Sequence, residues 1–184
     1  MIKNLFAHRA ALVIALISVF TLPANTFAAV QPNIGIDSYF SANRAQRGRT
    51  IQAAIVLDIP RELHINANRP LDRALIATTL QVNAPNGVRV SPVSYPRPVM
   101  RRFSFSRDQL AVYENRAVMR FTLTIPANYQ SDIIEVRARV RYQACNDQAC
   151  FQPQSRETTM AVSVVGANDP VQRANSQIFG GRRS

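Results

Sequence analysis

Apolar and polar residues alternate along three long stretches of the chain. The clearest runs from Ile134 to Tyr142, where every second residue is apolar and the residues between are Glu135 and three arginines. The same alternation covers Thr50 to Ile59 and Ala117 to Ile125. A period of two with one apolar face predicts strands that bury one side.

Shorter segments of the same kind fill the space between these strands. The sequence predicts further strands at Ile34–Tyr39, Glu62–Ile65, Thr78–Val82, Arg89–Val93 and Thr159–Val165. Asn86-Gly87 is a typical hairpin turn, which predicts that the strands on either side of it pair. Many short strands separated by turns indicate an all-β fold, and we expect an immunoglobulin-like antiparallel β-sandwich.

The two ends of the chain depart from this pattern. Residues 1–28 have a basic start, a short apolar run and a small-residue site for cleavage after Ala28, which predicts a secretory signal peptide. The polar tail 166–184 is expected to be disordered. The folded domain should therefore span residues 29–165 and lie in the periplasm or be otherwise secreted.

The chain is strongly basic, with 22 Lys and Arg against 11 Asp and Glu and a formal net charge of +11. Such a balance first suggests nucleic acid as a partner. No basic helix, RNA-binding motif or zinc pattern accompanies the charge, and export would separate the protein from nucleic acid. We therefore expect no nucleic-acid partner, and the basic surface favours anionic material of the cell envelope.

The only two cysteines, Cys145 and Cys150, follow the Ile134–Tyr142 strand and are separated by four residues. In an exported protein they should form a disulfide. Closing so short a loop stabilises the fold by only about 2 kcal/mol, which makes the bond a weak staple. The spacing alone leaves two alternatives open, a redox-active disulfide and a small structural clip on a hairpin.

Other chemistry is poorly supported by the residue types present. Zinc needs four ligands, but His64 is the only histidine after residue 28, and we predict no metal site and no cofactor. One histidine without a nucleophile motif also argues against a hydrolase.

The segment from Val140 to Pro153 resembles a known family signature. The strand ends in Tyr142-Gln143-Ala144-Cys145, and a short acidic loop leads to Cys150-Phe151-Gln152-Pro153. This arrangement is similar to that in the N-terminal periplasmic domain of the DsbD thiol:disulfide interchange proteins. The segments 63–70 and 112–115 also resemble that family, so that the likeness covers roughly residues 34–165.

The resemblance implies an immunoglobulin-like fold and a thiol–disulfide oxidoreductase of the protein-disulfide reductase type. It implies that Cys150 attacks the disulfide of an acceptor and that Cys145 resolves the mixed disulfide. It also implies a cap loop with an aromatic residue, here within 91–105, for which Tyr95 and Phe103 are the candidates. Tyr142, Asp147 and His64 are further supporting candidates around the pair.

Several residues differ from the family pattern. The cap loop carries Arg97, Arg101 and Arg102 where the family has acidic residues, and these arginines or Arg141 are candidates to lower the pKa of a thiol. The membrane and thioredoxin-like domains of the family have no counterpart here, so we expect a separate membrane electron donor and periplasmic thiol/disulfide proteins as partners. The alternative function is an immunoglobulin-like binding or assembly module with a structural disulfide.

Overall fold

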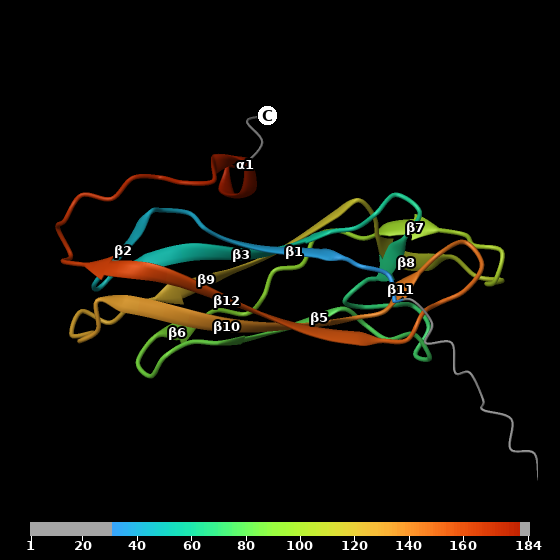
Figure 1. The fold of residues 1–184 in the computed structure, drawn as a ribbon, viewed down its shortest axis with the longest axis horizontal. Helices are drawn as coiled ribbons and strands as arrows, with labels where there is room; N and C mark the ends of the chain where they lie inside the picture. Colours follow the sequence, from blue (N-terminus) through green and yellow to red (C-terminus); the bar gives the residue numbers. More distant parts are fainter. Residues whose placement is uncertain (1–30, 181–184) are drawn as a thin grey trace, which may run out of the picture. The chain divides into compact units, whose positions relative to one another are not determined.

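A computed structural model describes residues 31–180, and the predicted signal peptide lies outside these residues. The described part is built almost entirely from strands (Figure 1). In chain order they are β1 (Gly35–Phe40), β2 (Arg44–Gln46), β3 (Thr50–Asp58), β4 (His64–Asn66), β5 (Thr79–Asn83), β6 (Arg89–Val90), β7 (Val99–Arg101), β8 (Leu110–Tyr113), β9 (Arg116–Thr124), β10 (Ile133–Tyr142), β11 (Ala144–Cys145) and β12 (Gln154–Val165), followed by the short helix α1 (Ser176–Phe179). None of the helices in residues 31–180 is long and apolar enough to cross a membrane.

The strands form three four-stranded sheets. Two of them, with the orders β1-β3-β9-β6 and β2-β12-β10-β5, are the layers of a sandwich, and their pairs are antiparallel except for β2 with β12. The immunoglobulin-like sandwich that the sequence predicts is therefore confirmed. The third sheet, β11-β4-β8-β7, is small and lies at one end of the sandwich (Figure 1).

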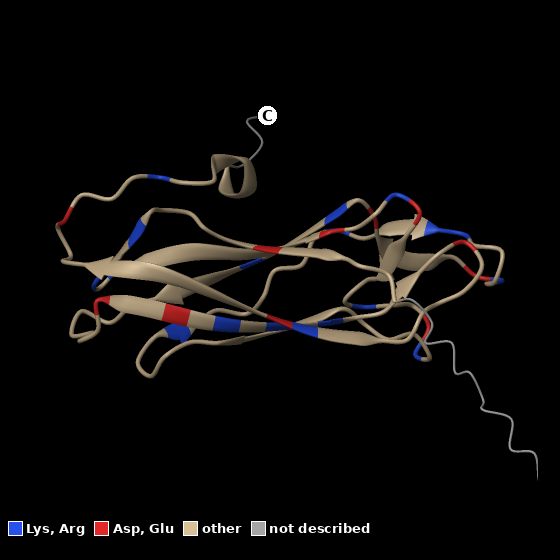
Figure 2. Ribbon diagram, in the orientation of Figure 1, with Lys and Arg blue, Asp and Glu red and all other residues tan. Residues whose placement is uncertain are grey.

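The core lies between the two large sheets. The alternating apolar residues of β3, β9 and β10 all point inward and are buried, from Ile51 to Leu57, from Ala117 to Leu123 and from Ile134 to Tyr142. The strand period of two places these side chains on one face and the charged residues of β10 on the other. Figure 2 shows the basic residues spread along the whole ribbon rather than gathered in one patch.

The predicted hairpin at Asn86-Gly87 is wrong. Gly87 does adopt a left-handed φ of 89°, as a turn requires. The flanking strands nevertheless part, because β5 pairs with β10 in one sheet and β6 pairs with β9 in the other. The turn thus carries the chain from one layer of the sandwich to the other.

The tail from Gly166 differs from the disordered segment that the sequence predicts. Up to Gly180 it lies against the β1 and β3 side of the fold, where Asn43 N–H donates to Gln172 C=O and Ala174 N–H donates to Ser41 C=O. Ile178 is 2% exposed and packs with Ala54 and Val56 on the outer face of β3. The average polarity of the tail concealed the apolar pair Ile178 and Phe179, and residues 181–184 lie outside the described part.

Candidate functional site

A disulfide joins Cys145 to Cys150, with their Cα atoms 3.9 Å apart. Asn146 builds the turn between them: its N–H donates to Ala149 C=O, and its side-chain Oδ1 accepts the N–H groups of Gln148 and Ala149. This Asx-type turn fixes the loop locally. The chain leaves it with Phe151 N–H donating to Ala144 C=O.

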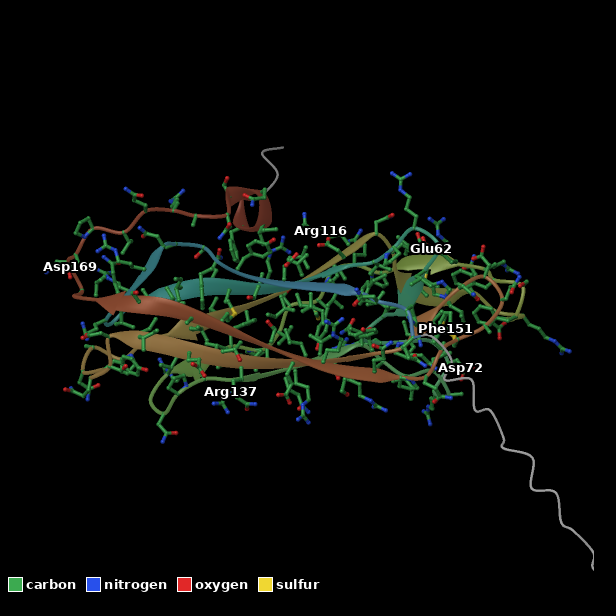
Figure 3. All side chains as sticks on the ribbon, in the orientation of Figure 1. Glu62, Asp72, Arg116, Arg137, Phe151 and Asp169 are labelled. Atoms are coloured by element: carbon green, nitrogen blue, oxygen red, sulfur yellow. A yellow bond between two sulfur atoms is a disulfide. The ribbon has the colours of Figure 1, made fainter. Side chains whose placement is uncertain are left out.

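The two cysteines of the disulfide differ in exposure. Cys145 is fully buried in β11, whereas Cys150 is partly exposed at the end of the turn. An incoming thiol or disulfide therefore meets Cys150 first. Figure 3 shows Phe151, the next residue, at the same end of the sandwich as Glu62 and Asp72 and far from Asp169.

Strand β4 supports the buried cysteine. Cys145 pairs directly with His64, and Ala144 pairs with Ile65, in antiparallel register. Residues directly opposite in such a pair point to the same face, with Cβ atoms about 5 Å apart. The His64 side chain is thus a cross-strand neighbour of the Cys145 sulfur.

Two aromatic rings cover His64. The rings of Phe103 and His64 are stacked with centroids 3.8 Å apart and planes inclined by 11°. Phe105 lies parallel to Phe103 at a centroid distance of 5.5 Å. The intervening Ser104 hydroxyl donates to the carbonyl of Asp147, which ties this segment to the cysteine turn. The segment 103–105, called the cap below, therefore covers His64 and contacts the cysteine turn.

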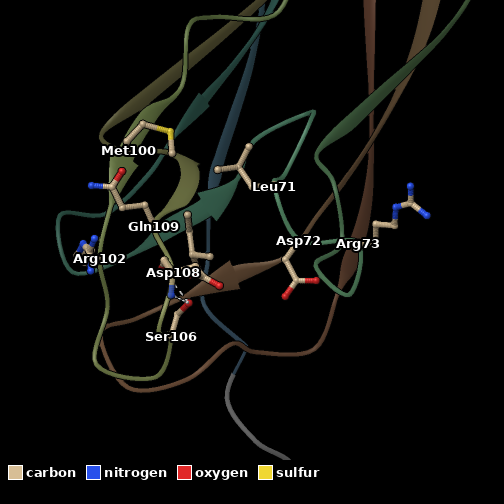
Figure 4. A pocket seen from close by; sticks show the side chains of 9 residues that line it. Leu71, Asp72, Arg73, Met100, Arg102, Ser106, Asp108 and Gln109 are labelled. Carbon is tan, nitrogen blue, oxygen red and sulfur yellow. Dashed lines mark hydrogen bonds between the residues drawn. The ribbon is translucent and has the colours of Figure 1, made fainter.

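An ion pair borders the cap. The guanidinium of Arg101 donates to both carboxylate oxygens of Glu114, at 2.9 and 2.8 Å. Both residues line a cleft of about 540 Å³ together with Arg61, Arg102, Phe103 and Asp147. A neighbouring groove of about 720 Å³, between Leu71, Met100 and Arg102, is shown in Figure 4, and neither cysteine lines it.

Burial and charge act against each other at His64. The imidazole is 3% exposed, and burial lowers its pKa below 6.5, while the nearby carboxylates of Glu114 and Asp147 partly raise the pKa again. Among the described residues, none forms a hydrogen bond with its buried Nε2. The Arg101 hydrogen bonds lower the pKa of Glu114, which keeps that carboxylate charged.

Five of the seven predicted site residues come together, namely Cys145, Cys150, His64, Phe103 and Asp147. Tyr95 does not join them: its ring packs against the core, and its hydroxyl accepts the N–H of Leu80 at the start of β5. Tyr142 is buried in the core, where burial raises the pKa of its hydroxyl, and it bonds Gln154. Arg141 lies on the exposed face of β10.

Sequence reasoning missed the role of Gln143. Its Nε2 donates to Phe151 C=O, and its Oε1 accepts from the Asn66 side chain and from Ile76 N–H. Gln143 therefore ties the exit of the cysteine turn to β4. The turn-forming Asn146 could have been recognised from residue type alone, since Asn favours such turns. Ser104, Phe105 and Glu114 carried no comparable signal.

No group of three or more His, Cys, Asp or Glu side chains in residues 31–180 could hold a metal ion. The arrangement instead offers a disulfide with one accessible and one buried cysteine, held by a turn, a strand and an aromatic cap. An immunoglobulin-like domain with such a pair at its end has the accessible sulfur that thiol–disulfide exchange requires.

Comparison with known proteins identifies the family. Residues 37–161 match the family model described as thiol:disulfide interchange protein DsbD, N-terminal. The chain belongs to this family, whose members are periplasmic domains, and its disulfide-forming pair together with this membership supports thiol–disulfide exchange. No curated protein sequence matches the chain.

The solved structures that are similar to this chain include two N-terminal domains. The DsbD N-terminal domain of Neisseria meningitidis, in its reduced form, is 11% identical with a TM-score of 0.41, and the match covers 76% of this chain and 90% of that one. The N-terminal periplasmic domain of ScsB from Proteus mirabilis is 12% identical with a TM-score of 0.47, over 82% of this chain and 51% of that one.

Proposed function

We propose that the protein is a periplasmic protein-disulfide reductase that carries electron pairs through Cys145 and Cys150. The observation that carries the proposal is the difference in exposure within the disulfide, with Cys150 reachable from solvent and Cys145 fully buried. Exchange proceeds by attack of a thiolate on an accessible sulfur through a mixed disulfide. Only Cys150 meets that requirement in the closed domain.

In the reduced protein, the Cys150 thiolate attacks one sulfur of an acceptor disulfide. A Cys150–acceptor bond forms, and the second acceptor sulfur leaves as a thiolate that takes up a proton. Cys145 then attacks Cys150, the Cys145–Cys150 bond forms, and the acceptor leaves as a dithiol. Two electrons have passed to the acceptor, and a donor dithiol reverses the sequence to restore the pair.

The cap supplies selectivity in this proposal. Phe103, Ser104 and Phe105 cover His64 and contact the cysteine turn, so that small oxidants reach the buried side of the pair poorly. A partner protein that displaces the rings uncovers the buried side of the pair, beside the already accessible Cys150. The cap is thus the element that separates cognate partners from unspecific thiols.

We propose a membrane-embedded electron donor and periplasmic thiol/disulfide proteins as partners, in keeping with the family. Periplasmic location also rests on the family and on the signal-peptide pattern of residues 1–28. The scattered arginines favour weak, salt-sensitive attraction to anionic envelope surfaces rather than one defined site.

The test is a trapping experiment in the periplasm of a bacterial host. A Cys145→Ala variant should accumulate mixed disulfides through Cys150, visible as thiol-sensitive adducts on non-reducing gels. The matched Cys150→Ala variant leaves only the buried thiol and should form none. A disulfide that dithiothreitol reduces only after the domain unfolds, together with no adducts, would contradict the proposal and favour a binding module with a structural disulfide.

A further inference from the structure

His64 occupies an unusual position for a structural histidine. It is 3% exposed, yet its Nε2 has no hydrogen-bond partner among the described residues. Buried polar atoms in folded proteins are nearly always hydrogen-bonded, and an exception at a reactive site calls for a chemical explanation. The stack with Phe103 needs only a flat ring, which a phenyl group would supply without burying a polar nitrogen.

The sheet register sets the neighbour of this imidazole. His64 and Cys145 are directly opposite in the β4–β11 pair, which puts both side chains on the same face. Cys145 is fully buried, so that water cannot readily take its proton in the reduced protein. A buried thiol also favours its neutral form, which is a poor nucleophile. The resolving step therefore needs a local proton acceptor.

We propose that His64 is the proton acceptor for Cys145 in the resolving step. This inference rests on the proposed exchange function and assigns a residue to its second half. Nε2 of His64 takes the proton from the Cys145 thiol, and the resulting thiolate attacks the Cys150 sulfur of the mixed disulfide. The Cys145–Cys150 bond forms, the Cys150–acceptor bond breaks, and the departing acceptor thiolate takes the proton back from the imidazolium. In the donor reaction the same proton moves in the opposite direction.

Charged groups around His64 favour the transient imidazolium. Glu114, the residue after β8, and Asp147 in the cysteine turn both stabilise the charged ring, which offsets part of the cost of burial. Arg101 holds the Glu114 carboxylate from β7, and Arg61 and Arg102 line the same cleft. The two carboxylates therefore favour the transient charge on the ring, and three arginines line the same cleft.

The test separates the two halves of the exchange with the aromatic disulfide reagent DTNB. Reduced full-length protein should release thionitrobenzoate in two phases, a concentration-dependent attack by Cys150 and a unimolecular resolution by Cys145. In the His64→Phe variant, which keeps a flat buried ring, the unimolecular rate at pH 7 should fall about tenfold or more. The deficit should shrink near pH 9, as the thiol ionises unaided, and the first phase should stay unchanged.

A His64→Gln variant provides a second reading, since it keeps a polar group but cannot titrate. Wild-type pH profiles for the unimolecular phase in both folded variants would overturn the inference and leave the proposed function intact. Absence of both phases in the folded wild type would overturn the proposed function itself. If neither variant folds, the NMR signals of the His64 ring are followed against pH in reduced wild type and in Cys145→Ser. The two titrations should lie at least about half a pH unit apart. Coincident titrations would refute the coupling.

Discussion

The phenyl ring of Phe103 lies flat on the imidazole of His64, with centroids 3.8 Å apart. His64 in turn lies directly across the β4–β11 pair from Cys145. The cap is therefore coupled to the buried cysteine through a single side chain. The environment of the inner sulfur therefore depends on this stack.

Removal of the inner cap ring should open the site. We expect Phe103→Ala to raise the rate of disulfide reduction by dithiothreitol severalfold, since the ring that covers His64 is lost. Phe105→Ala is the matched control: Phe105 is 37% exposed and lies 6.3 Å from the His64 ring, so that its effect should be smaller. Stopped-flow or gel-based reduction kinetics measure both, and equal rates in all three proteins would exclude a shielding role.

His64 should make the stability of the oxidised protein depend on pH. Its pKa in the folded state lies below the ordinary value of 6.5 because of burial. Below about pH 6.5 the unfolded chain gains a proton that the folded chain resists, so the free energy of unfolding should fall as the pH drops. Urea denaturation between pH 7.5 and 5 should show this loss, and the loss should be smaller in His64→Phe.

The Arg101–Glu114 ion pair predicts a change at more acidic pH. Arg101 lowers the pKa of Glu114 below 4.5, so its stabilisation is present above about pH 4.5 and disappears as the pH falls through the lowered value. The difference in stability between wild type and Arg101→Gln should follow that course. The effect should be small because Arg101 is exposed. Arg102 forms no ion pair among the described residues, so Arg102→Gln is the control and should show no such dependence.

The fold was largely predictable, because strand periodicity depends on local alternation that can be read from the sequence. The patterns of β3, β9 and β10 predicted their inward faces correctly. Strand pairing depends instead on distant partners, which is why the turn at Asn86-Gly87 gave a wrong hairpin. The run Ala53 to Leu57 buries both faces of β3, and its outer cover, Ile178, lies more than a hundred residues away.

The site was predictable where residue type limits the choice. Two cysteines left one possible pair, and its motif indicated the chemistry. The capping aromatic was not predictable, since Tyr95 and Phe103 lie in one aperiodic segment and only tertiary contacts separate them. The buried neighbourhood of His64 likewise arises from register and stacking, which a single sequence does not encode locally.

Gln143 should couple domain stability to the cysteine turn. In Gln143→Ala, the Phe151 carbonyl, the Asn66 amide and the Ile76 N–H lose their bonds in a half-buried site. We expect a loss of about 1–3 kcal/mol in the free energy of unfolding and faster disulfide reduction. Gln130→Ala is a control, because that side chain bonds only Asn128 in an exposed turn. Unchanged stability in Gln143→Ala would show that the network contributes little.

The tail after Gly166 should stabilise the sandwich without affecting the redox site. Ile178 is buried against Ala54 and Val56, and the Arg120 guanidinium donates twice to the Ile178 carbonyl. Ile178→Ala should lower the free energy of unfolding by about 2 kcal/mol, while Phe179→Ala, at a partly exposed position, should cost less. Dithiothreitol reduction should keep the wild-type rate in both, since the tail contacts β1 to β3 and β9 rather than the cysteine turn. A stability equal to wild type in Ile178→Ala, measured by urea denaturation, would mean that the tail does not hold its place on the sheet in solution.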